Sequence, residues 1–321
     1  MSEATRPARP VAVAGGLGQR WRHLVQSRGF FAITLLLPAT LVLLAVQVYP
    51  ITNTLLLSLS SYNLLRPDRG IVYNFPDNFV WLVQNELFWL ALGNTLILMV
   101  GVVALEMVAG LTIALLLNEP FRGYPLVRAI FILPWAIPTV VVAWLAKAMA
   151  HPTYGAFNQI PNAVLVPLGL VKEPLALNWL GDPNLALWTV LAVLAWKGMP
   201  FVILVLLAGL QAIPAEIEEA AQIDGANGWQ QLWYITLPSL RMVILIASIL
   251  RAISVFNGFD LPWLLTGGGP LNKTLIMPIF FYDEAFGVFQ MGRAASITVV
   301  MMVFLMAMVF LLLRIQPKEE R

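Results

Sequence analysis

Long apolar segments alternate with shorter polar ones along most of this chain. Six segments are dominated by apolar side chains, and they cover residues 30–49, 94–117, 126–149, 185–210, 243–265 and 294–313. A helix rises about 1.5 Å per residue, so about twenty residues cross a hydrocarbon layer of about 30 Å. The pattern therefore predicts an all-α membrane protein with six transmembrane helices, in a domain that covers residues 30–313.

Polar segments separate and flank these spans. Residues 50–87, 150–183 and 266–292 are rich in charged or turn-forming side chains and are predicted to be exposed loops. The polar, basic segment 1–29 resembles the start of a signal peptide. The apolar run that follows is too long for one, however, and no small-residue cleavage site comes after it. We therefore expect an uncleaved first span.

The distribution of lysine and arginine predicts the orientation in the membrane. The side of the two termini would carry Arg6, Arg9, Arg20, Arg22, Arg28, Arg122, Arg128, Arg241, Arg314, Lys318 and Arg321. The opposite side would carry fewer, namely Arg66, Arg69, Lys147, Lys172, Lys273 and Arg293. Because basic residues are enriched in cytoplasmic loops, the segments 1–29 and 314–321 are predicted to be cytoplasmic.

Composition supports the membrane assignment and excludes several chemistries. Hydrophobic residues make up 60% of the chain, charged residues 11%, and the mean hydropathy is +0.81. Soluble domains are about 45–50% apolar and about 25% charged. The chain has no cysteine, which excludes disulfides, iron–sulfur clusters and thiolate zinc sites. A net charge of +2 is too small to favour nucleic acid as a partner.

The polar segment 212–240 is predicted to form two short helices joined by a turn. Pro214 suits a first helical turn, where its missing N–H costs nothing. Glu216, Glu218 and Glu219 then place negative charge at the positive end of the helix dipole. Gly225 is suited to leave the first helix in a left-handed conformation.

The second helix has its own start and end signals. Asn227 and Gln230 have the spacing of a capping box, and Pro238 is expected to end the helix. One apolar face is predicted from helical spacing, made of Trp229, Leu232, Trp233 and Thr236. From the pattern alone, the segment could also be an amphipathic hairpin lying on the membrane surface.

The same segment resembles the EAA loop of binding-protein-dependent ABC importer permeases. Glu219-Ala220-Ala221, three residues, Gly225, nine residues and then Ile235-Thr236-Leu237-Pro238 match that loop at every position. The resemblance implies a type I ABC importer permease fold in which this loop is the cytoplasmic coupling helix that enters a cleft on an ATPase. The residues implied in ATPase coupling are Glu219, Ala220, Ala221, Asp224, Gly225, Leu237 and Pro238.

Other segments resemble sugar permeases of this family. Residues 128–138 are similar to the entry of their third span. Residues 256–260 and 265–270 are similar to the MalF class of maltose transporters, as are Tyr154, Gly155 and Asn158. The chain lacks the large periplasmic insertion and the extra leading spans of the enteric maltose protein. Its size is closer to that of the short sugar, glycerol-phosphate and polyol permeases.

The resemblance also implies partners and a location. A second homologous permease subunit, two ABC ATPase subunits and an extracytoplasmic solute-binding protein would complete the transporter. ATP and Mg would bind to the ATPase partner, so this chain would hold no cofactor of its own. The substrate would be a sugar, a polyol or a glycerol conjugate, and the chain would lie in a bacterial or archaeal cytoplasmic membrane.

Polar residues within the fifth span are candidates for the substrate path, because charges inside spans are costly and mark functional sites. The candidates are Arg251, Ser254, Asn257, Gly258 and Asp260. A hydroxyl-rich ligand needs several fixed donors and acceptors in an otherwise apolar site. Arginine, serine and asparagine supply these, and Gly258 leaves room for a ring. Alternatively, Arg251 forms an ion pair with Glu106 or Asp260.

Three further residues have two interpretations each. Glu106 is expected to be a structural partner rather than part of the site. Lys197 lies beside the helix-breaking Gly198 and Pro200, so it would sit at a kink or face a cavity. Trp135 would belong to the aromatic belt of the bilayer or stack on a sugar.

No catalytic or metal-binding constellation is predicted. His23 and His151 are expected on opposite sides of the membrane, and no Ser-His-Asp group can be assembled from facing spans. Residues 267–274 resemble a phosphate loop superficially, but Asn272 precedes Lys273 where glycine is required. A membrane-embedded enzyme that uses Arg251 and Asp260 on a lipid-linked substrate is one alternative function, and a non-transporting receptor or scaffold is another.

Overall fold

The computed structural model describes residues 28–119 and 122–314, and most of them are helical. Residues 1–27 of the predicted segment 1–29, and residues 315–321 of the predicted tail 314–321, lie outside the described residues. The chain divides into two compact units, Met1–Leu56 and Leu57–Arg321. Each unit is described by itself.

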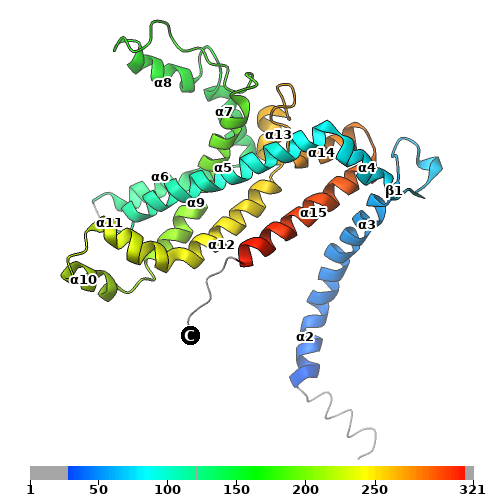
Figure 1. Cartoon of the computed structure of the whole chain (residues 1–321), viewed down its shortest axis with the longest axis horizontal. Coiled ribbons are helices and arrows are strands. Elements are labelled where there is room, and N and C mark those ends of the chain that lie inside the picture. Colours follow the sequence, from blue (N-terminus) through cyan, green and yellow to red (C-terminus); the bar gives the residue numbers. More distant parts are fainter. Residues whose placement is uncertain (1–27, 120–121, 315–321) are drawn as a thin grey trace, which may run out of the picture. The chain divides into compact units, whose positions relative to one another are not determined.

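In the first unit, the predicted first span continues further than its apolar run suggested. Helix α2 (Arg28–Leu43), the π-helical turn η1 (Leu44–Val48) and helix α3 (Tyr49–Ser58) follow one another directly (Figure 1). Pro50 is tolerated because it lies in the first turn of α3, directly after the π-helical turn. The prediction that a loop begins at residue 50 is therefore wrong.

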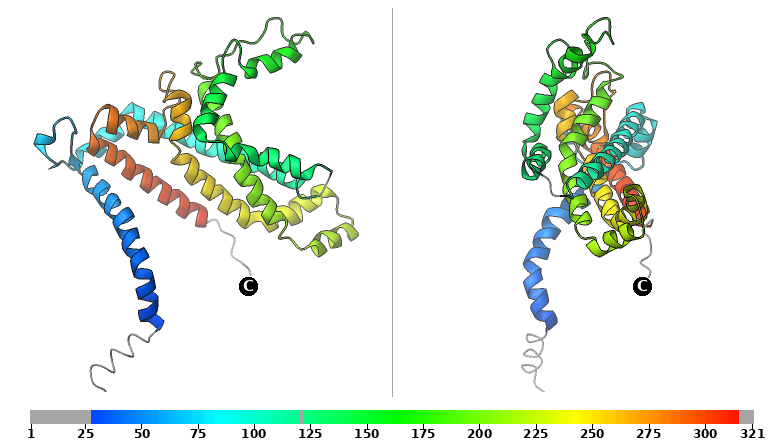
Figure 2. Two further views of the ribbon diagram at one scale, coloured as in Figure 1. Left: turned by 180° about the vertical axis from the view of Figure 1, so that it is seen from behind. Right: turned by 90° about the vertical axis from the view of Figure 1, so that its left-hand side faces the viewer.

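In the second unit, long helices pack side by side. They are α5 (Glu86–Leu116), α9 (Ala186–Leu210), α12 (Leu237–Phe256) and α15 (Met291–Arg314). Figures 1 and 2 show α12 beside both α5 and α15. The core between these helices is apolar, and Val102, Val202 and Phe256 have no exposed surface. Because α5 and α9 are apolar almost all round, both can be enclosed by other helices.

The predicted third span, 126–149, is broken in the structure. Helix α6 (Tyr124–Ala136) and helix α7 (Thr139–Met149) are bent by 101° relative to one another. Ile137 between them is extended, with φ −76° and ψ 130°. The break follows from Pro138, because the residue before a proline is disfavoured in helical geometry. Within residues 28–119 and 122–314, five long helices and this bent pair give up to six candidate spans.

The fifth span begins and ends earlier than predicted. Helix α11 (Gly228–Gln231), the π-helical turn η3 (Leu232–Thr236) and α12 follow without interruption. The prediction that Pro238 ends the second helix is wrong. Pro238 lies in the first turn of α12, directly after the π-helical turn, where proline is tolerated. The span ends at Phe256, and α13 (Asp260–Thr266) is a separate short helix.

Short elements fill the connections. They are β1 (Ser60–Ser61), η2 (Pro67–Arg69), β2 (Val72–Tyr73), α4 (Asp77–Gln84), α8 (Ala156–Leu165), α10 (Ala215–Ile223), α14 (Met277–Tyr282) and η4 (Asp283–Gly287). Strands β1 and β2 are antiparallel, with Ser60 opposite Tyr73. Figures 1 and 2 show α10 and α11 at one end of the second unit, with α4 and α14 toward the other end.

Candidate functional site

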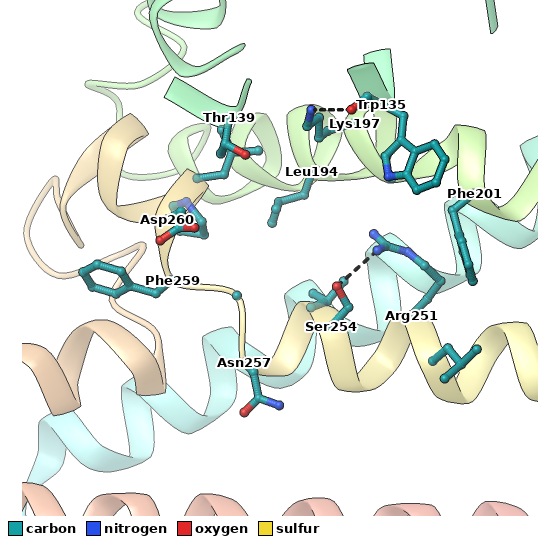
Figure 3. Close-up of a pocket in the computed structure, with 16 residues that line it drawn as sticks. Trp135, Thr139, Leu194, Lys197, Phe201, Arg251, Ser254, Asn257, Phe259 and Asp260 are labelled. Atoms are coloured by element: carbon teal, nitrogen blue, oxygen red, sulfur yellow. Dashed lines mark hydrogen bonds between the residues drawn. The ribbon is translucent and has the colours of Figure 1, made fainter. Parts of the chain in front are cut away.

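A cavity of about 610 Å³ lies among α6, α7, α9, α12 and the segment that leads into α13 (Figure 3). All five residues predicted for the substrate path line it: Arg251, Ser254, Asn257, Gly258 and Asp260. Lys197 adds a further polar group, and the apolar wall includes Trp135, Leu194, Phe201 and Phe259. Whether these residues contact a substrate stays a prediction.

Arg251 is paired with Glu106, which was one of its two predicted roles. Its Nε donates to one carboxylate oxygen of Glu106 at 2.6 Å, and its Nη2 donates to the other at 2.7 Å. Glu106 is completely buried. A bidentate ion pair of this kind fixes both the position and the plane of the guanidinium. The remaining nitrogen, Nη1, donates to the Ser254 hydroxyl at 3.3 Å.

Gly198 makes room for this ion pair. A Cβ atom at position 198 would overlap both the Arg251 guanidinium and the Glu106 carboxylate. The glycine was interpreted as part of a helix break, but α9 continues as one helix through Gly198 and Pro200. Its function here is therefore close packing of α9 on the ion pair.

Lys197 faces the cavity and the break between α6 and α7. Its Nζ donates to backbone carbonyls of Pro134, Trp135 and Ile137. Figure 3 shows the bond to Trp135. Lys197 thus contacts the broken helix rather than a kink in its own helix.

The end of α12 forms the other wall of the cavity. Asn257 caps this helix, and its side-chain amide donates to the carbonyl of Ile253 at 3.1 Å. Gly258 lies in the break before α13, where the chain changes direction. Asp260 opens α13, which places its negative charge at the positive end of that helix.

Some residues that line the cavity were not predicted from the sequence. Thr139, Leu194 and Phe201 line it beside the predicted residues. Each is an ordinary residue of an apolar span, so no local pattern distinguishes it. Only the packing of α9 against α12, and of α7 against α13, brings these three side chains together.

The EAA loop has the geometry expected from its sequence at Gly225. This residue has φ +82° and comes directly after Asp224, the C-cap residue of α10. Its N–H bonds to the carbonyl of Gln222 at 3.1 Å, and the N–H of Ala226 bonds to that of Ala221 at 2.9 Å. These two bonds form the Schellman motif that ends many helices. The prediction for Gly225 is confirmed.

The capping box of the second helix is also confirmed. The Asn227 side chain accepts from the N–H of Gln230 at 2.9 Å, and the Gln230 side chain accepts from the N–H of Asn227 at 2.8 Å. Two reciprocal bonds make the loop a defined structure. Leu237 and Pro238 then lie in the first turn of α12.

Large apolar side chains of this loop are exposed in the single chain. The exposed fraction is 70% for Trp229 and 55% for Trp233, both from the predicted face. Ile223 and Tyr234 are 86% and 80% exposed and were missed, because they follow no helical period with that face. Of the alanine pair, Ala221 is buried within the chain and Ala220 is exposed.

The segment between α7 and α9 is held by a buried asparagine. The Asn158 amide donates to the carbonyls of Pro152 and Leu177, both at 2.9 Å, and its oxygen accepts from the Trp179 indole at 3.0 Å. Asn158 has no exposed surface. It was singled out only through a family resemblance, and the structure shows that it organises this loop.

Metal binding finds no support in the described part of the chain. Among residues 28–119 and 122–314, no three His, Asp or Glu side chains are grouped so that they could hold an ion. His151 stacks on Tyr154 with ring centroids 3.6 Å apart. His23 lies outside the described residues.

Comparisons with known proteins agree with the spans and the loop. Residues 106–321 match the family described as the binding-protein-dependent transport system inner membrane component. The trehalose/maltose transport system permease protein MalF of Thermococcus litoralis is 35% identical over 86% of this chain and 91% of its own length. The sulfoquinovosyl glycerol transport system permease protein SmoG of Agrobacterium fabrum is 31% identical over 92% and 94%.

Solved structures show the same fold. A bacterial alginate ABC transporter, crystallised in complex with an alginate pentasaccharide-bound periplasmic protein, contains a chain with a TM-score of 0.74 and 23% identity. The match covers 91% of this chain and 95% of that one. On the combined evidence of family match, relatives and spans, the chain belongs to the family of binding-protein-dependent transport system inner membrane components.

Proposed function

We propose that this chain is a membrane-spanning permease subunit of an ATP-driven importer, and that its substrate is a sugar, a polyol or a glycerol conjugate. The cavity beside α12 carries the proposal. Three of its lining residues are polar: Ser254, Asn257 and Asp260, which carry a hydroxyl, an amide and a carboxylate. Two aromatic residues, Trp135 and Phe259, line other parts of the cavity. This mixture suits a ligand that has many hydroxyls and apolar ring faces.

The names of the relatives point to the same substrate class. One is named for trehalose and maltose, and another for sulfoquinovosyl glycerol. Which compound this chain carries depends on a solute-binding protein that delivers it. The solved alginate transporter, which was crystallised with its periplasmic protein, supports such a partner.

A second permease subunit would complete the site. Ser254, Asn257 and Asp260 are exposed in the single chain although they line the cavity. In a transport path that excludes water and lipid, another protein surface must cover them. A homologous subunit packed against α12 would supply that surface.

One of the two ATPase subunits of the transporter would bind the EAA loop of this chain. Trp229, Trp233 and Tyr234 offer a large apolar surface on a hairpin with capped helices. Docking of an ATPase there would bury this surface, and ATP-driven closure of the ATPases would move the hairpin and the spans attached to it. ATP and Mg would stay on the ATPase, so this chain hydrolyses nothing.

Neither alternative function gains support. An enzyme that used Arg251 as a catalytic cation would need a free guanidinium, but the ion pair with Glu106 occupies it. A scaffold would not need a polar cavity among its spans. The family and the named relatives are transport components.

Reconstitution tests the proposal. The cognate binding protein is first screened by thermal shift against sugars, polyols and glycerol conjugates, and the stabilising compound is used in uptake assays. Vesicles that contain the whole transporter should accumulate it only with ATP on the ATPase side and with the binding protein present. ATP-dependent accumulation by vesicles that lack this chain would refute the assignment.

A further inference from the structure

The break in the third span leaves backbone carbonyls without helical partners. Helix α6 ends at Ala136, Ile137 is extended, and α7 starts at Thr139 with a new direction. The last carbonyls of a helix have no partner within that helix. Inside a membrane, water is not available to bond them, so another part of the protein must do so.

Lys197 donates hydrogen bonds to the carbonyls at the C-terminal end of α6 and at the break. Its Nζ lies 2.9 Å from the carbonyl oxygen of Pro134 and 3.4 Å from that of Trp135, and it also bonds to the carbonyl oxygen of Ile137. A lysine ammonium has three N–H donors, and these three carbonyls can accept all of them. Its positive charge also faces the negative end of the α6 dipole.

This geometry argues against Lys197 as a direct substrate ligand. With three carbonyls as acceptors, the ammonium has no donor left for a hydroxyl in the cavity. Arg251 pairs with Glu106 nearby, and Lys197 forms no ion pair within the described residues. The partners of Lys197 are therefore the backbone of the broken span.

The bend that Lys197 holds also shapes the cavity. Trp135 lies just before the break and Thr139 just after it, and both line the cavity with Lys197 itself. A change in the bend would move one of these side chains relative to the other. Figure 3 shows Trp135 and Thr139 on the same side of the cavity as Lys197.

We propose that Lys197 is a positioning residue that caps the end of α6, fixes the bend between α6 and α7, and thereby sets the places of Trp135 and Thr139 in the cavity wall. The role in transport rests on the function proposed above, whereas the role in the bend does not. The two can therefore fail separately.

Spin labels measure the bend directly. The chain has no native cysteine, so cysteines can be introduced at Leu126 and Leu145, which are exposed on α6 and α7. A straight helix would separate these positions by about 28 Å, and the bent span brings them closer. In the full transporter, Lys197→Met should shift the distance distribution to longer values and broaden it, and Lys197→Arg should keep it narrow.

Lys147→Met is the matched control. Lys147 lies in the last turn of α7, and its ammonium lies 5.5 Å from the ring centroid of Trp144. This variant should leave the distribution between the labels unchanged. An unchanged distribution in Lys197→Met, or an equal change in both variants, would overturn the proposal.

A chemical rescue covers the case in which Lys197→Met does not assemble. Lys197→Cys, in the otherwise cysteine-free chain, is treated with 2-bromoethylamine, which adds an ammonium at the length of lysine. Uptake should fall at least tenfold in the variant, recover after this treatment, and stay low after a neutral methylthiolating reagent. Equal recovery with both reagents, or full uptake before treatment, would show that the ammonium has no positioning role.

Discussion

The guanidinium of Arg251 and the carboxylate of Glu106 form a two-pronged ion pair, although 145 positions separate them in the chain. The pair joins α12 to α5 at the edge of the cavity, with Gly198 of α9 packed against it. Three spans thus meet at one buried charge pair. Because Glu106 balances its charge, we expect Arg251 to act mainly by holding Ser254 and the α12 wall in place.

Removal of one partner of this pair should destabilise the protein. Arg251→Met leaves the Glu106 carboxylate buried and uncompensated, which costs about 3–5 kcal/mol. The double variant Glu106→Met with Arg251→Met removes both charges and should recover most of that loss. Thermal unfolding of the purified transporter measures both effects.

Uptake assays on the same variants distinguish a structural role of Arg251 from a role in the substrate path. If Arg251 acts through the ion pair alone, the double variant should regain uptake together with stability. Recovery of stability without uptake would show that Arg251 acts in the path itself. Equal destabilisation by the single and the double variant would contradict the structural role of the pair.

Gly225→Val should uncouple the transporter. Its φ of +82° costs a residue with a side chain about 1 kcal/mol or more, and valine is the least tolerant of it. The turn between α10 and α11 should therefore deform. Binding-protein-stimulated ATP hydrolysis should fall several-fold, and the ATPase should dissociate more readily during purification, whereas membrane insertion should be normal.

Gly228→Val is the control for that variant. Gly228 lies three residues further, at the start of α11, with open space around its Cβ position and no positive φ. This control should keep the ATPase bound. Full uptake and full ATPase yield with Gly225→Val would remove the reason to regard this loop as the coupling element.

The orientation in the membrane can be tested with single cysteines. The excess of lysine and arginine on the side of the termini predicts that Gly155 lies outside the cell and Gln230 inside it. The cysteine for the inner side is best placed at Gly228, because a substitution of Gln230 itself would disrupt the capping box. An impermeant thiol reagent added to intact cells should label a cysteine at Tyr154, beside Gly155, and not one at Gly228. The reverse labelling pattern would contradict a six-span arrangement with cytoplasmic termini.

Glu284 should make stability depend on pH. Its Oε2 is buried and has no hydrogen-bond partner among the described residues. Burial raises the pKa of this carboxyl, and Asp283 adds to the rise, whereas Arg293 opposes it. The folded protein then holds a proton that the unfolded chain releases, so stability falls as the pH rises from the ordinary pKa to the raised one.

Glu284→Gln removes that dependence because glutamine stays neutral. Its unfolding temperature should therefore exceed that of the wild type by an amount that grows as the pH is raised from about 5 to about 8. Thermal unfolding of both proteins over this range measures the difference. A difference that stays constant or shrinks with rising pH would show that Glu284 does not titrate as proposed.

Local features of the fold were predictable where the signal lies within a few residues. Gly225 and the pair Asn227 and Gln230 each have a short pattern with one physical solution, and both patterns were confirmed. The bend at Pro138 and the continuous helix at Pro238 were not predicted. Both positions combine a proline with an apolar run, and the proline by itself does not tell whether the helix breaks or continues.

The site was predictable only in part, for a related reason. Polar residues on α12, such as Ser254, stand out against an apolar span and were identified. Thr139 and Phe201 do not stand out, because they join the cavity only after α7 packs against α13 and α9 packs against α12. The partner of Lys197 is the backbone of a broken helix, and sequence patterns carry no information about that contact.

The central claim is that the cavity beside α12 is the transport path, and cysteine labelling tests it most directly. Ser254→Cys is introduced into the cysteine-free chain, and Ile246→Cys, which is exposed on the same helix outside the cavity, is the control. Labelling of Ser254→Cys with a bulky maleimide should abolish ATP-dependent uptake, and transported substrate should slow that labelling, whereas labelled Ile246→Cys should transport normally. Normal uptake after complete labelling of Ser254→Cys would contradict the account.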